Sequence, residues 1–228
     1  MSTSVSANLA QVRKRIELAC HAAGRLPDTV QLLAVSKTMP AQAVREAYAA
    51  GQIAFGENYI QEGVDKIASL ADLPLVWHCI GPVQSNKTKL VAENFAWVHS
   101  IDRLKIAERL SAQRPAHLPP LQVCLQVNVD GGINKSGVAP TELLALANAV
   151  AQLPQLQLRG IMTIPEPADT EVATRAVHHQ ARTLFESLKA AGLKLDTLSM
   201  GMTSDLEAAI AEGSTCVRVG TAIFGARQ

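Results

Sequence analysis

Short apolar segments alternate with helical patterns along nearly the whole chain. An amphipathic helix is predicted over Val5–Ala23, because apolar residues recur there at helical spacing. Eight apolar runs of strand length follow: Gln31–Ser36, Gln52–Phe55, Leu75–Ile80, Ala96–Ser100, Gln122–Val129, Gln157–Ile161, Thr197–Met200 and Cys216–Val219. Between them, good helix formers predict helices that include Ala41–Ala50, Asp102–Gln113, Thr141–Gln152 and Thr170–Ala191.

This strand-then-helix alternation predicts a parallel sheet. Eight such units in 228 residues suit an α/β fold, a single (β/α)8 TIM barrel with an extra N-terminal helix. A doubly wound open sheet is the structural alternative. The proline-rich stretch Pro115–Pro120 has the length of a loop rather than of a linker, so we expect residues 1–228 to form one domain.

The amino-acid composition excludes several classes of function but says little about the fold. The chain is 48% hydrophobic and 18% charged, with a formal net charge of +1, so nothing indicates nucleic-acid or membrane-surface binding. Aromatic residues make up 4%, too few for a platform that stacks single-stranded nucleic acid. No signal peptide and no apolar run of membrane-spanning length are visible, so we expect a cytoplasmic protein.

The cysteines carry no metal-binding or disulfide pattern. They are Cys20, Cys79, Cys124 and Cys216, and no CxxC pair occurs among them. Because three of them lie inside apolar runs, we predict small buried hydrophobic side chains rather than a zinc site.

Lys37 is the first candidate for chemistry. It ends the apolar run Leu32–Ser36, and Pro40 follows shortly afterwards. This places Lys37 at the C-terminal end of the first strand, where a barrel builds its active site. A lysine amine that is partly desolvated, or that has a cationic neighbour, can attack a carbonyl and form a Schiff base. A solvated lysine at a strand end is the plain alternative, which this segment alone favours.

Glycine and hydroxyl residues follow the last two strands, in Gly201–Asp205 and Gly220–Gly225. Each glycine lets the backbone approach a ligand, and each loop opens a helix whose N-terminal amides favour an anion. The loops after strands 7 and 8 of such barrels commonly bind phosphate, so the pair predicts a phosphate site. Thr203 or Ser204 could instead serve only as a helix N-cap.

Other polar residues keep more than one interpretation. Arg218, inside an apolar strand, either forms an ion pair or faces a ligand; beside a heterocyclic nitrogen it would keep that nitrogen unprotonated. His78 could be a catalytic base, but a hydrogen-bonded core residue is the favoured interpretation. A phosphate-binding barrel isomerase is another possible function. It would need a carboxylate base at a strand end, and Glu57 is the best candidate. His178 and His179 have no partner at metal spacing and are predicted at the surface.

Six segments together resemble one family. They are Ala34–Pro40, Phe55–Glu62, Trp77–Lys87, Asn134–Val138, Leu198–Thr215 and Val217–Arg227. In order, they contain AVSKTMP, FGENYIQE, WHCIGPVQSNK, NKSGV, LSMGMTSDLEAAIAEGST and VRVGTAIFGAR. The chain resembles the pyridoxal 5′-phosphate (PLP) homeostasis protein family, whose barrel is related to the N-terminal domain of alanine racemase.

The resemblance implies a cofactor and a set of residues that hold it. PLP would be bound to Lys37 as an internal aldimine. Asn58 would lie near the ring, and Arg218 would face the pyridine nitrogen. The residues implied for the phosphate cup and the pocket wall are Thr203, Ser204, Gly220 and Thr221, with Met200 and Gly201. Lys135 matches a family lysine that could hold a second, transient PLP position.

The end of the chain bears on whether the protein is an enzyme. The sequence stops at Gln228, soon after the last predicted strand, so we expect no second, β-rich domain like that of the racemases. A racemase needs two opposed acid–base groups, and beside Lys37 only Tyr59 is a possible second. The resemblance therefore implies a monomeric, non-enzymatic carrier or regulator that passes PLP to apo-enzymes. A small PLP-dependent amino-acid racemase is the alternative.

Overall fold

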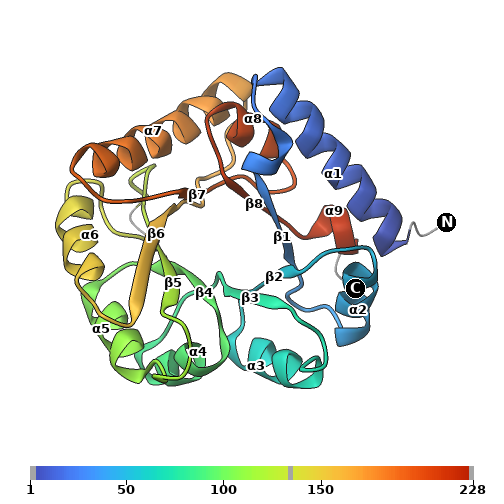
Figure 1. Ribbon diagram of the computed structural model, residues 1–228. Coiled ribbons are helices and arrows are strands. Elements are labelled where there is room, and N and C mark those ends of the chain that lie inside the picture. Colours follow the sequence, from blue (N-terminus) through green and yellow to red (C-terminus); the bar gives the residue numbers. More distant parts are fainter. Residues whose placement is uncertain (1–3, 133–135, 226–228) are drawn as a thin grey trace.

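Eight parallel strands pair in chain order and close into a barrel through β8 and β1 (Figure 1). The computed structural model describes residues 4–132 and 136–225. The strands are β1 Gln31–Val35, β2 Ala54–Glu57, β3 Val76–Cys79, β4 Trp97–Ile101, β5 Leu121–Gln126, β6 Leu156–Met162, β7 Thr197–Ser199 and β8 Cys216–Val219. The predicted (β/α)8 barrel is confirmed. The open-sheet alternative is wrong, because β8 pairs with β1 and leaves no strand edge open.

A ring of helices surrounds the strands (Figure 1). They are α1 Val5–Ala22, α2 Ala41–Ala49, α3 Ile60–Ser69, α4 Thr88–Asn94, α5 Leu104–Gln113, α6 Leu143–Ala151, α7 Glu171–Ala190, α8 Leu206–Ala211 and α9 Thr221–Phe224. Short 3-10 turns span Pro27–Thr29 and Ser85–Lys87. The predicted extra helix is α1, which packs against α2, α8 and α9. It therefore covers the side of the barrel where the last strand meets the first.

The strands separate two apolar regions. Leu33 and Val35 of β1 join a small cluster with Ile80 and Cys216, enclosed by the strands. Ala34 belongs instead to the large cluster between the strands and the helices. Because side chains alternate across a strand, Leu33 and Val35 both face the barrel interior, and Lys37 follows two positions after Val35, just beyond the end of β1.

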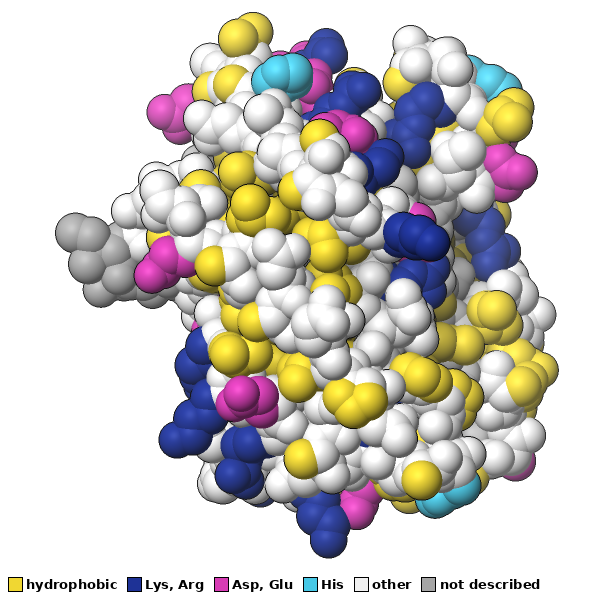
Figure 2. Space-filling view, turned by 60° about the vertical axis from the view of Figure 1, so that its left-hand side comes forward, with side chains coloured by type: hydrophobic (Ala, Val, Ile, Leu, Met, Phe, Trp, Pro, Cys, Tyr) yellow, Lys and Arg dark blue, Asp and Glu magenta, His cyan; other side chains and the backbone are white. Residues whose placement is uncertain are grey.

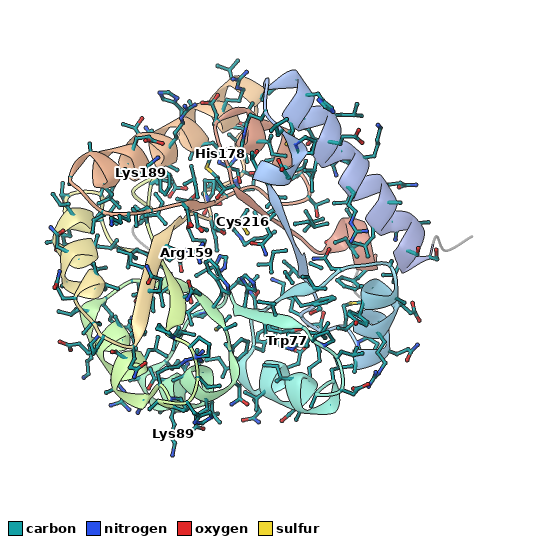
Figure 3. All side chains as sticks on the ribbon, in the orientation of Figure 1. Trp77, Lys89, Arg159, His178, Lys189 and Cys216 are labelled. Carbon is teal, nitrogen blue, oxygen red and sulfur yellow. The ribbon has the colours of Figure 1, made fainter. Side chains whose placement is uncertain are left out.

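All four thiols are free and buried, so the cysteine prediction is confirmed. Burial raises the pKa of Cys79 to about 12 and that of Cys216, inside the barrel in Figure 3, to about 11, so both thiols are protonated and unreactive at neutral pH. None of the described helices has the length and apolarity to cross a membrane. On the face shown in Figure 2, basic and acidic side chains are interspersed, consistent with a net charge of +1.

Candidate cofactor site at the barrel mouth

Four adjacent strand ends carry the candidate residues. β7, β8, β1 and β2 lie side by side in the closed barrel. The segments that follow them contain Met200–Ser204, Gly220–Thr221, Lys37 and Asn58 respectively. Because the C-terminal ends of parallel strands open at the same end of a barrel, these segments border one side of its mouth. Lys135 lies outside the described residues.

A chain of hydrogen bonds crosses the barrel interior from Arg218. Its Nη1 donates to Ser199 Oγ and its Nη2 to the Thr163 carbonyl, each at 2.8 Å. Ser199 Oγ lies 2.9 Å from His99 Nδ1, and His99 Nε2 lies 2.9 Å from His78 Nδ1. Burial lowers the pKa of His78 to about 3 and that of His99 well below its ordinary value. Both imidazoles are therefore neutral, and the interpretation of His78 as a core residue is confirmed.

Arg218 is a buried cation with neutral hydrogen-bond acceptors. Its exposed fraction is 4%, and no carboxylate of the described residues lies within ion-pairing distance. Burial lowers the pKa of Arg218, yet a guanidinium stays charged and offers five N–H donors. The hydroxyl of Thr163, beside it in the chain of hydrogen bonds, is buried without a partner in the described structure. The remaining N–H donors of Arg218 and the Thr163 hydroxyl could therefore form hydrogen bonds with a polar ligand.

The loop after β7 is held in place from three directions. Gly201 has φ +95°, and a Cβ there would lie 2.5 Å from Ala209 Cβ, so the position requires glycine. The amide of Met202 donates to Asp205 Oδ1 at 2.6 Å. From α1, Arg15 Nη2 donates to the Thr203 carbonyl at 2.9 Å. A backbone held this way is suited to present its amides and hydroxyls to an anion.

The hydroxyl residues differ in their access to solvent. Ser204 and Thr221 are exposed and Thr203 is half-buried, so all three are accessible to a ligand. Met200, in contrast, is fully buried in the large apolar cluster. Its side chain therefore packs behind the loop, and its backbone is the part that can border a pocket.

The surface prediction for His178 is wrong. His178 is fully buried on the inner side of α7, with Nε2 2.9 Å from Asp205 Oδ2 (Figure 3). Burial raises the pKa of Asp205, but the hydrogen bonds from His178 and the Met202 amide bring it below its ordinary value. His179 is exposed, as predicted, with Nδ1 3.1 Å from Glu212. His178 thus supports the loop through Asp205.

Glu57 lies behind the barrel wall rather than at the mouth. It is 1% exposed, and its Oε1 accepts from Ser36 Oγ at 2.6 Å and from Lys66 Nζ at 2.7 Å. The neighbouring Gly56 faces the interior, since a Cβ there would lie 3.2 Å from Leu33 Cδ2. Burial raises the pKa of Glu57, against the lowering effect of Lys66. The isomerase hypothesis therefore loses support, because its base faces the helix layer.

A cleft of about 490 Å³ lies beside the loop after β7, lined by residues that include Met202 and Ser204. Its lining also contains the acidic residues Glu166, Asp169, Glu171, Asp205 and Glu207. Carboxylates repel a phosphate. We therefore expect a phosphate on the other side of this loop, towards Gly220 and Thr221.

Several supporting residues escaped the sequence reasoning: Arg15, Ser36, Lys66, His99 and Ser199. A polar residue within an apolar strand, as at His99 and Ser199, was a visible signal. Arg15 and Lys66 gave none, because charged residues on amphipathic helices normally face solvent.

Comparison with known proteins extends over the whole chain. The family model described as "Alanine racemase, N-terminal domain" matches residues 7–228. A pyridoxal phosphate homeostasis protein of Pseudomonas aeruginosa is 65% identical over 228 residues, which cover 100% of this chain and 97% of that protein. A protein of the same name from Escherichia coli K12 is 56% identical over 227 residues, covering 98% and 97%.

Solved structures resemble the barrel as well. PipY of Synechococcus elongatus PCC7942, with PLP bound, has a TM-score of 0.85 and 44% identity, covering 97% of this chain and 100% of that one. An alanine racemase of Clostridium difficile 630 has a TM-score of 0.79 and 15% identity, covering 98% of this chain and 57% of that one. The second likeness shows the fold alone.

Proposed function

Because the chain belongs to the pyridoxal phosphate homeostasis protein family, we propose that it binds PLP and regulates or buffers the intracellular PLP supply without catalytic turnover. The observation that carries the proposal is the set of adjacent strand ends that bring Lys37, two glycine loops and the buried Arg218 to one side of the barrel. The names of the relatives support it, as does the PLP bound to PipY.

The residues at the mouth suit the three functional parts of PLP. When bound, PLP supplies an aldehyde, with which the Lys37 amine would form a Schiff base. Arg218 has N–H donors for the pyridine nitrogen and keeps that nitrogen unprotonated. Thr203, Ser204 and Thr221, with the loop amides, would bind the phosphate. The proposed site is completed by Asn58 beside the ring and, at the wall, by Gly201, Gly220 and the Met200 backbone.

A carrier or regulator is preferred to the alternative, a small amino-acid racemase. Racemisation needs an acid–base group on each face of the substrate. Tyr59 is 54% exposed at the start of α3, and Tyr48 lies on α2 in the helix layer, so neither is held opposite Lys37 by its surroundings. We further propose a cytoplasmic monomer of one domain that delivers PLP to apo-enzymes.

Absorption spectroscopy tests the covalent link. Wild type incubated with PLP should show the yellow band of a Schiff base, and Lys37→Ala should lose or shift it. Lys89→Ala is the control, because Lys89 is an exposed lysine on α4. A wild type that remains colourless with PLP would overturn the proposal. Amino-acid racemisation on the order of 1–1000 per second would refute the non-enzymatic part.

A further inference from the structure

A buried ion cluster lies directly behind Lys37. Its centre is Lys66 of α3, whose side chain is 5% exposed. The ammonium donates to the Ser36 carbonyl at 2.8 Å, to Glu57 Oε1 at 2.7 Å and to Glu62 Oε1 at 3.0 Å. An ammonium has three N–H donors, so each has an acceptor. A buried charge is tolerated only with such complete pairing.

This cluster holds both peptide groups that flank Lys37. The Ser36 carbonyl, which accepts from Lys66, belongs to the peptide before Lys37. The Thr38 amide belongs to the peptide after it and donates to Glu62 Oε1 at 2.6 Å. The orientation of these two planar groups sets φ and ψ of the residue between them. One ion cluster therefore fixes the backbone conformation of Lys37.

The turn that carries Lys37 is strained and needs this support. The Met39 amide donates to the Ser36 carbonyl at 3.0 Å, which closes a four-residue turn with Lys37 at its second position. Thr38, at the third, has φ +65° and is the one non-glycine residue of the described chain with positive φ. A β-branched residue is disfavoured there, and a flip of the Lys37–Thr38 peptide would relieve the strain. The bond from the Thr38 amide to Glu62 opposes that flip.

We propose that Lys66 and Glu62 are positioning residues for Lys37: their hydrogen bonds to the peptide groups on either side of Lys37 fix the Ser36–Met39 turn in the conformation from which the Lys37 amine captures PLP. This inference rests on the proposed function. Lys66 acts through its hydrogen bond to the Ser36 carbonyl, and Glu62 acts through its bond to the Thr38 amide. Neither side chain need touch the cofactor.

Substitutions at Glu62 test the proposal, because its side chain is 31% exposed and its loss leaves the Lys66–Glu57 pair intact. Glu62→Ala should slow the appearance of the yellow band after PLP addition about tenfold, as expected for the loss of a charge-assisted hydrogen bond. Glu62→Gln should restore the rate to within about threefold of wild type, since an amide oxygen also accepts hydrogen bonds. Asp65→Ala is the matched control on α3, where Asp65 bonds to the exposed Gln61.

Hydrogen exchange of the PLP-free protein separates this inference from the proposed function. Exchange of the Thr38 amide should accelerate in Glu62→Ala and in Lys66→Met, and remain at the wild-type rate in Asp65→Ala. Unchanged exchange and capture in Glu62→Ala would overturn the positioning role, even where Lys37→Ala shows that Lys37 binds PLP. A wild type that forms no Schiff base defeats the proposed function instead, and the exchange result still decides whether the cluster holds the turn. Should Lys66→Met fail to fold, the Glu62 variants decide.

Discussion

Removing the Asp205 carboxylate would show how strongly the fold holds the proposed phosphate loop. Its Oδ1 accepts from the Met202 amide at 2.6 Å, and its Oδ2 lies 2.9 Å from His178 Nε2. Hydrogen bonds to a charged group contribute about 1.5–3 kcal/mol each. Loss of both should destabilise Asp205→Ala by about 3 kcal/mol or more, which lowers Tm by roughly 6–12 °C in a chain of this size. PLP affinity should fall too, because the loop loses its anchor.

A double-mutant cycle isolates the contact between the two side chains. His178→Leu replaces a fully buried histidine with an apolar side chain and removes one of the two bonds. Urea unfolding of wild type, Asp205→Ala, His178→Leu and the double variant should give a coupling energy of about 1–2 kcal/mol. Effects that add to within about 0.3 kcal/mol would refute the claim that His178 supports the loop through Asp205.

The pH dependence of the same variant has a defined sign. The folded-state pKa of Asp205 is below its ordinary value, because hydrogen bonds from His178 and Met202 outweigh burial, which raises it. Such a carboxylate stabilises the fold above its unfolded pKa, about 3.9, and this contribution is lost as pH falls through the folded pKa. The stability difference between wild type and Asp205→Ala should therefore be complete at neutral pH and shrink below about pH 4. A constant difference down to pH 3 would contradict this account.

Two further predictions concern His78, in the barrel interior, and Gly81, in the segment after β3. Burial lowers the pKa of His78 to about 3, so the unfolded chain takes up the proton first and stability should fall as pH drops below about 6.5. His78→Gln should reduce that slope by up to about 1.4 kcal/mol per pH unit, measured by urea unfolding, and an unchanged slope would contradict the assignment. At Gly81, a Cβ would collide with the Asn58 carbonyl. Gly81→Ala should therefore lower both Tm and PLP affinity, and wild-type values would show that the backbone yields.

The barrel was predictable because strand and helix periodicity alternate so regularly. All five predicted helix spans end within two residues of the observed ones. β2 was less accurate: the prediction covered Gln52–Phe55, whereas the strand is Ala54–Glu57. Gln52 is buried, but its side chain donates to the Leu32 and Ala54 carbonyls instead of extending the strand. The predicted strand ended at Phe55, before Glu57, and a carboxylate inside a strand is unusual. Lys66 neutralises that carboxylate.

Positions that follow from the topology could be predicted, whereas buried polar partnerships could not. Lys37 was identified by its place at a strand end, and the fold brings that end to the barrel mouth. The pairing of His178 with Asp205 joins side chains 27 positions apart, and that of Lys66 with Ser36 joins groups 30 positions apart. No local pattern reveals such partners, because they meet only after α7 and α3 have packed.

Three cations are buried among the described residues: Lys66, Arg218 and Arg114, the last of which donates to three backbone carbonyls. Lys66 and Arg218 differ in how their charges are compensated. Lys66 has carboxylates at 2.7 and 3.0 Å, so its charge is compensated within the fold. Arg218 bonds only to a hydroxyl and a carbonyl among the described residues, and neutral oxygens offset its desolvation less than a carboxylate does. Burying such a cation costs desolvation free energy, and at Arg218 a ligand with a hydrogen-bond acceptor would recover part of it. Complete pairing at Lys66 therefore suits a structural support, and incomplete pairing at Arg218 suits a binding residue.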